Sequence, residues 1–126
     1  MGNPRVVGVD HVVLNVSDVE RSLAFYRETL GLAPVRVDEW RRGEAPFPSV
    51  RVDDSFIIDL FPAARTGANL DHFCLVVEST DLEALAASGR FEVVNGPGRR
   101  FGARGDGLSL YVKDPDGNTV ELRCYA

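Results

Sequence analysis

The sequence predicts an α+β domain built from two copies of a β-α-β-β-β module. Three observations predict it. Leu70-Asp71-His72 repeats the pattern of Val9-Asp10-His11, with the second histidine 61 residues after the first. Each copy continues with a strand-like alternation and then a helix-like stretch that ends at glycine. Each also closes on an apolar strand interrupted by one carboxylate, Asp59 in the first copy and Glu121 in the second.

The first module covers about residues 6–61. Val6–Val16 alternates in polarity and predicts a strand. Ser17 or Asp18 is the expected N-cap of a helix that runs to about Leu30 and stops at Gly31. Three short strands are expected next, around Pro34–Glu39, Phe47–Val52 and Phe56–Phe61, with a loop at Arg41–Pro46 and a tight turn at Asp53-Asp54.

The second module covers about residues 70–125, after a linker at residues 62–69. Its first strand is followed by a helix from Thr80 or Asp81 to about Ser88, stopped by Gly89. Strands are expected at Phe91–Asn95, Leu108–Lys113 and Thr119–Cys124, with a loop at Gly96–Gly107 and a turn at Asp114–Asn118. The two modules are expected to form a single domain over residues 1–126.

Strand parity places four polar side chains on one side of the modules. Side chains alternate along a strand, so His11 and His72 point away from the apolar residues that pack under each helix. Asp59 and Glu121 also alternate with helix-facing apolar residues. Two equivalent modules would therefore offer one cavity two imidazoles and two carboxylates.

This donor set suits a five- or six-coordinate divalent metal, with positions left for water or substrate. Imidazole favours borderline ions and carboxylate harder ones, so Fe, Mn, Ni, Co and Zn all stay open. A lone histidine on a strand is more often satisfied by a hydrogen bond. Here both histidines and both carboxylates occupy repeated positions, and the repetition favours a metal site.

Composition excludes several classes of partner. A net charge of −5 and a pI near 5.0 argue against nucleic acid or an anionic membrane as the main partner. No apolar run is long enough to span a membrane and no signal-peptide pattern opens the chain, so a cytoplasmic location is expected. A small-molecule partner is the remaining expectation.

The chain resembles the vicinal oxygen chelate superfamily, also called the glyoxalase/bleomycin-resistance/dioxygenase family. The most specific motifs are Val9-Asp10-His11 with the following SDVERSLAFYRETLGL, and the closing stretch from Tyr111 through DPDGN to Leu122. The resemblance implies a half-open barrel around a central cavity, in a homodimer. It implies metal ligands at His11, His72 and Glu121, with Asp59 at the position of a fourth carboxylate.

The resemblance also implies chemistry on two neighbouring oxygens of a small substrate. A lyase or isomerase of glyoxalase type is the first expectation, with Glu121 or Asp59 as the base. A dioxygenase is the second, suggested by the place of Tyr111, and a metal-free binding protein of the bleomycin-sequestering kind is the alternative. Further candidates for contacts to an anionic substrate are Ser109, Arg123, and the arginines Arg99, Arg100 and Arg104 of a mobile lid formed by the Gly96–Gly107 loop.

Overall fold

The computed structural model describes residues 2–113, 115 and 117–125, and it divides into two compact units. The first unit is His11–Asp71. The second unit joins the chain before His11 to the chain from His72 onward. The boundaries cross two strands, β1 (Val6–Val16) and β5 (Leu70–Val77). The predicted α+β class is confirmed, while the half-open barrel, which concerns how the units join, stays a prediction.

The first unit holds four strands in the order β2-β3-β4-β1. The three that follow β1 in sequence are β2 (Ala33–Val35), β3 (Ser49–Asp53) and β4 (Phe56–Pro62). The last strand, β4, pairs parallel with β1, and the other neighbours are antiparallel. The turn between β3 and β4 is Asp54-Ser55, one residue later than predicted.

The first helix begins where the sequence predicts. In α1 (Val19–Ala24), the side chain of Asp18 accepts a hydrogen bond from the backbone N–H of Arg21 at 3.0 Å. The helix then widens into a π-helical segment, η1 (Phe25–Thr29), which the sequence did not predict. Gly31, with φ of +76°, ends it as expected.

The predicted strand at Pro34–Glu39 is wrong beyond Val35. Arg36 adopts a left-handed φ of +56°, which turns the chain into the helix α2 (Val37–Arg41). Val37 and Trp40 are three residues apart, and both pack on the apolar cluster around Leu23 of α1. Burial of this helical face therefore overrides the strand-like local sequence.

The second unit repeats the topology of the first. Its strands run in the order β5-β8-β7-β6, with β8 (Thr119–Cys124) parallel to β5 and the other neighbours antiparallel. The helix α3 (Leu82–Ala87) is capped by Asp81, whose side chain accepts from the N–H of Ala84 at 3.0 Å. The core under α3 contains Leu75, Val77, Leu82, Leu85, Leu110, Val112, Val120, Leu122 and Cys124. The βαβββ repeat is thus confirmed.

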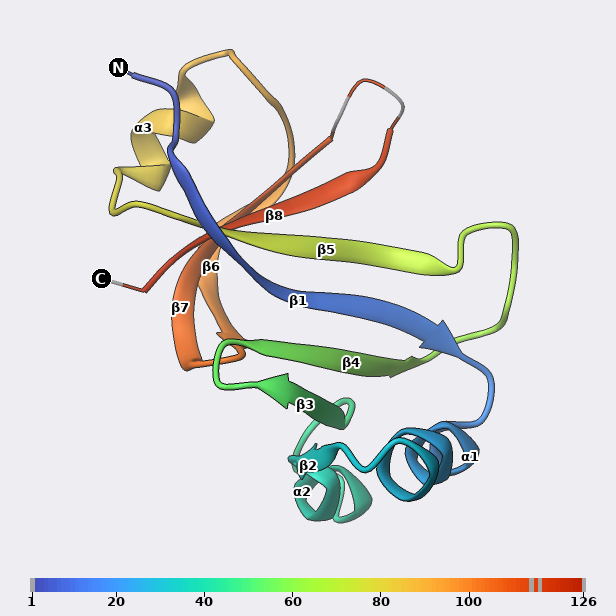
Figure 1. The fold of residues 1–126 in the computed structure, drawn as a ribbon. Helices are drawn as coiled ribbons and strands as arrows, with labels where there is room; N and C mark the ends of the chain where they lie inside the picture. The colour runs from blue at the N-terminus through green and yellow to red at the C-terminus, as the bar shows by residue number, and fades with distance from the viewer. Residues whose placement is uncertain (1, 114, 116, 126) are drawn as a thin grey trace. The chain divides into compact units, whose positions relative to one another are not determined.

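The predicted loop at Gly96–Gly107 is wrong. β6 (Glu92–Gly102) and β7 (Gly105–Lys113) form a long antiparallel hairpin through this stretch (Figure 1). The glycines allow close approach by buried groups, because a Cβ on Gly102 would lie 2.5 Å from Nη1 of Arg123. Cross-strand hydrogen bonds between β6 and β7 hold this backbone, so the predicted mobile lid is wrong.

Two further points complete the fold. The predicted turn at Asp114–Asn118 includes Asp114 and Asp116, which lie outside the described residues, while Gly117 has the expected positive φ of +87°. Among the described residues, no helix is long and apolar enough to cross a membrane.

Candidate metal centre

In the second unit, His72 and Glu121 face each other. Cys74 of β5 lies opposite Glu121 of β8, so His72, two residues before Cys74, is on the same face of the strands as Glu121. Nε2 of His72 lies 2.9 Å from Oε1 of Glu121. Glu121 is fully buried, and His72 is largely buried.

The second carboxylate oxygen of Glu121 is held by two other side chains. Oγ of Ser109 donates a hydrogen bond to Oε2 at 2.7 Å, and Nη2 of Arg123 donates another at 3.0 Å. Both donors are fully buried. The carboxylate is therefore oriented, with Oε2 held by protein donors and Oε1 turned toward His72.

The first unit contains a similar arrangement around Asp59. Ser49 of β3 lies directly opposite Asp59 of β4, and its Oγ donates a short hydrogen bond to Oδ1. Oδ2 lies 3.8 Å from Nε2 of His11. All three side chains are buried.

Each unit thus carries a His–carboxylate–Ser triple. The triples are His11, Asp59 and Ser49 in the first unit, and His72, Glu121 and Ser109 in the second. Both histidines, both carboxylates and Ser109 are predicted from the sequence, whereas Ser49 is not. A signal was present, because Ser49 precedes Ser109 by 60 residues, close to the offset of the other repeated positions.

The triples fit the chemistry of a divalent ion. Two ligand atoms that are each about 2.0–2.2 Å from one ion lie roughly 3 Å apart. The separation in the second triple, 2.9 Å, is close to that value and is also a hydrogen-bond distance, whereas the 3.8 Å separation in the first triple is longer. Imidazole nitrogen with carboxylate oxygen is a donor set for Mn, Fe, Co, Ni or Zn. The serine contacts leave one oxygen of each carboxylate directed at the histidine, which suits single-oxygen ligation.

A buried polar network supports Glu121 from behind. The guanidinium of Arg123 also donates to the carbonyls of Phe101 and Arg100, each at 3.0 Å, and its Nε lies 4.0 Å from Oδ2 of Asp10. Tyr125 donates its hydroxyl to Oδ1 of Asp10. Burial opposes the charge of Arg123, but the adjacent Glu121 outweighs it and raises the pKa of the guanidinium above its ordinary value. Arg123, a predicted substrate contact, is enclosed by protein groups.

Tyr111 adjoins the second triple. It lies opposite Glu121 in the β7–β8 ladder, and its ring packs edge-on against His72 with centroids 5.3 Å apart. Burial, and next the charge of Glu121, raise the pKa of the Tyr111 hydroxyl well above its ordinary value. The hydroxyl therefore stays protonated at neutral pH, as a donor rather than a base.

The three arginines of the β6–β7 hairpin have different surroundings. Arg100 is half-buried, with its guanidinium 5.8 Å from the centroid of the Tyr111 ring. Arg99 is exposed and lies 3.7 Å from Asp106. Arg104 is exposed and stacks on Tyr125 at 4.1 Å. Of the three, Arg100 is the one whose guanidinium lies on Tyr111, beside His72.

Comparison with known proteins establishes the class. Residues 8–122 match the Glyoxalase/Bleomycin resistance protein/Dioxygenase superfamily. The chain belongs to this superfamily.

Individual relatives agree with this assignment. Virulence protein STM3117 of Salmonella typhimurium is 30% identical over 93% of this chain and 83% of the relative. Lactoylglutathione lyase GLX1 of Arabidopsis thaliana is 29% identical over 89% of this chain, which spans 42% of that enzyme. Among solved structures, the Mn(II)-bound glyoxalase from Novosphingobium aromaticivorans has a TM-score of 0.69 at 23% identity, over 97% of this chain and 40% of that one. This last likeness concerns the fold.

Proposed function

We propose that the protein is a divalent-metal-dependent enzyme that acts on two neighbouring oxygens of a small substrate, as a lyase or isomerase of glyoxalase type. The repeated His–carboxylate–Ser triple is the observation that carries the proposal. His11, Asp59, His72 and Glu121 are the proposed ligands. A divalent ion held by them would act as a Lewis acid on the substrate oxygens.

Relatives and neighbours support this choice of class. A lactoylglutathione lyase is among the curated relatives, and a glyoxalase with bound Mn(II) shares the fold. Both proteins are longer than this chain, so their substrates are not carried over. The homodimer expected from the resemblance stays a prediction.

The two carboxylates have different supports, and we assign them different roles. Glu121 is held by a hydroxyl and by a charged guanidinium, which fixes its position and favours the ionised form. Asp59 is held at Oδ1 by the neutral hydroxyl of Ser49. Glu121 is therefore the proposed permanent ligand. Asp59 is the proposed base that removes a proton next to a carbonyl.

The surrounding side chains supply substrate contacts. Tyr111 keeps its proton and can donate it in a hydrogen bond to a substrate oxygen near His72. The proposed cation for an anionic substrate group is Arg100, because it lies over Tyr111, whereas Arg99 and Arg104 contact Asp106 and Tyr125. Ser109 and Arg123 act on the substrate indirectly, as positioning residues for Glu121.

Metal content tests the proposal. Protein purified without a His-tag should carry a divalent metal that chelator removes and that His72→Ala and Glu121→Ala lose. If the parent protein neither contains nor takes up metal, the proposal fails, and the metal-free binding protein becomes the better account.

A further inference from the structure

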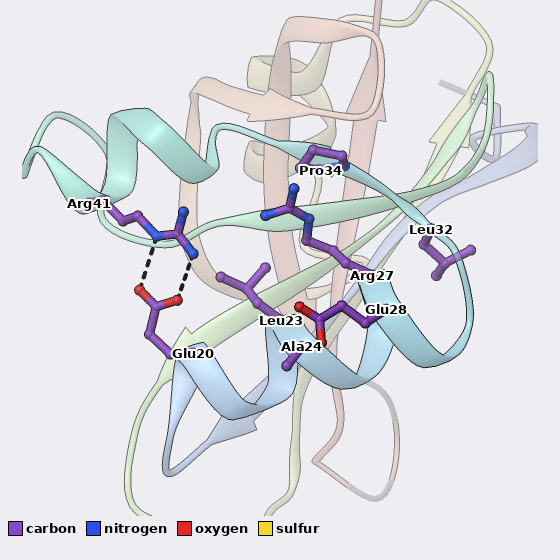
Figure 2. A pocket seen from close by; sticks show the side chains of 8 residues that line it. All are labelled: Glu20, Leu23, Ala24, Arg27, Glu28, Leu32, Pro34 and Arg41. Carbon is purple, nitrogen blue, oxygen red and sulfur yellow. Dashed lines mark hydrogen bonds and ion pairs between the residues drawn. The ribbon is translucent and has the colours of Figure 1, made fainter.

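A hollow lies in the first unit, between the first helix and α2 (Figure 2). It is separate from the candidate metal centre. Its volume is about 380 Å³. The lining side chains come from α1, η1, α2, β2 and Leu32, which precedes β2. None of the residues assigned to the candidate metal centre lines it.

Two guanidinium groups reach into this hollow, and they differ in their bonding. Arg41 donates from Nε and Nη2 to the two carboxylate oxygens of Glu20, at 3.0 Å and 2.7 Å. Arg27 is half-buried, and within residues 2–113, 115 and 117–125 no hydrogen bond or close ion pair is found for its guanidinium. Its charge still acts on Glu20, whose pKa is lowered first by the hydrogen bond from Arg41 and to a smaller extent by the charge of Arg27. Figure 2 shows the guanidinium groups of Arg27 and Arg41 on opposite sides of the space above Leu23.

The rest of the lining combines apolar and charged side chains. Leu23 is 2% exposed and belongs to the core under α1, while Ala24, Leu32 and Pro34 complete the apolar part of the wall. Glu28 is the second carboxylate of the lining. A ligand with a single negative charge therefore matches the hollow better than a dianion, because Glu20 and Glu28 would repel extra negative charge.

Arg27 lies within the π-helical segment η1. The N–H of Leu30 bonds to the carbonyl of Phe25 at 3.1 Å, five residues back, where an α-helix would bond four residues back. One extra residue in the turn shifts the following side chains by about 100° around the helix axis. Such segments are an unusual backbone choice and are frequent at functional sites.

We propose that this hollow binds a small monocarboxylate, held by a charge-assisted hydrogen bond from Arg27. The guanidinium fork matches the two oxygens of a carboxylate, and Ala24, Leu32 and Pro34 offer apolar contacts to the rest of a small ligand. The volume lies near the lower end of ligand pockets, about 300–1,000 Å³, which limits the ligand to a small molecule. This binding is independent of the metal centre and of the proposed function.

The test uses benzoate as the probe and neutral benzamide as its matched control. The full chain, ¹⁵N-labelled and treated with chelator, is titrated with each compound while amide chemical shifts are followed. Benzoate should shift amides within residues 20–41, and benzamide should bind at least roughly tenfold more weakly. Arg27→Gln should weaken benzoate by a similar factor, and Ala24→Phe, which fills the hollow, should abolish binding. Arg42→Gln, which changes an arginine outside the hollow, should leave binding unchanged.

Three results would overturn the proposal. If titration with benzoate leaves the amide shifts of residues 20–41 unchanged, the hollow takes no carboxylate. Equal binding of benzoate and benzamide would show that charge has no part. Unchanged benzoate affinity in Arg27→Gln, with the fold of the variant checked by its amide spectrum, would show that Arg27 is not the binding cation.

Discussion

Nη2 of Arg123 donates a hydrogen bond to Oε2 of Glu121 at 3.0 Å, between two side chains that are completely buried. The contact links the candidate metal centre to the network of Asp10 and Tyr125. The two oxygens of the carboxylate have different partners, because Oε2 accepts from protein donors and Oε1 faces His72. Stability and metal binding are therefore expected to depend on the same arginine.

Arg123→Met should destabilise the second unit. The substitution leaves Glu121 buried without its cation, which costs about 3–5 kcal/mol. The free energy of unfolding from urea titrations, followed by circular dichroism, measures the effect. Arg99→Met, at an exposed arginine of the same hairpin, is the control and should change stability by less than about 0.5 kcal/mol. Equal stability of Arg123→Met and the parent would contradict the network described here.

Ser109→Ala and Ser49→Ala should each weaken metal binding while the protein stays folded. Each removes a donor that orients a proposed ligand, and such changes typically lower metal affinity by about 10–100-fold. Calorimetric titration of chelator-treated protein with Mn²⁺ gives the affinities. The exposed turn residue Ser55→Ala serves as control. If both variants bind Mn²⁺ as tightly as the Ser55 control, the serines have no role in positioning the carboxylates.

The free energy of unfolding is expected to fall at alkaline pH because of the raised pKa of Tyr125. Burial and the hydrogen bond to Asp10 raise its pKa above the ordinary value of 10.0. An acid whose pKa is raised in the folded state adds stability that is complete below its unfolded pKa. That stability is lost as pH rises through the folded pKa. Unfolding free energy should therefore fall above about pH 10, and this fall should be smaller in Tyr125→Phe. Parallel curves for the two proteins would contradict the assignment.

Arg100→Gln should weaken anionic substrates or inhibitors and spare the metal. Its guanidinium lies over Tyr111, next to His72, so its loss removes a cation without touching a ligand. The measurement pairs metal content with binding of inorganic phosphate to the metal-loaded protein. Phosphate affinity should fall by roughly tenfold, whereas Arg104→Gln, at the arginine stacked on Tyr125, should leave it unchanged. A larger loss of phosphate affinity in Arg104→Gln than in Arg100→Gln would contradict the assignment of Arg100 as the substrate-binding cation.

The repeat explains how much of the site was predictable. His72 and Glu121 could be placed on one face because side chains alternate along strands, and the parity holds in the structure. Ser49 was missed because a lone serine on a strand carries no chemical signature of its own. Its role depends on the β3–β4 register, which places it opposite Asp59.

The misassigned segments have two different physical causes. Glycine, proline and arginine between Gly96 and Gly107 suggested a loop, but cross-strand hydrogen bonds and the packing of Arg123 against Gly102 hold it as a hairpin. The π-helical segment at Phe25–Thr29 differs from an α-helix by one residue in its hydrogen-bond spacing, and the spacing of apolar residues does not distinguish the two. The hollow beside Arg27 was hidden for the same reason.

The most direct test of the account is elemental analysis of the untagged protein beside its Glu121→Ala and His72→Ala variants, before and after chelator and reconstitution. Near-stoichiometric divalent metal per chain in the parent, lost in both folded variants and kept in Arg99→Gln, is the predicted result. Absence of metal from the reconstituted parent, or equal metal content in parent and variants, would contradict the claim that the two triples hold a metal.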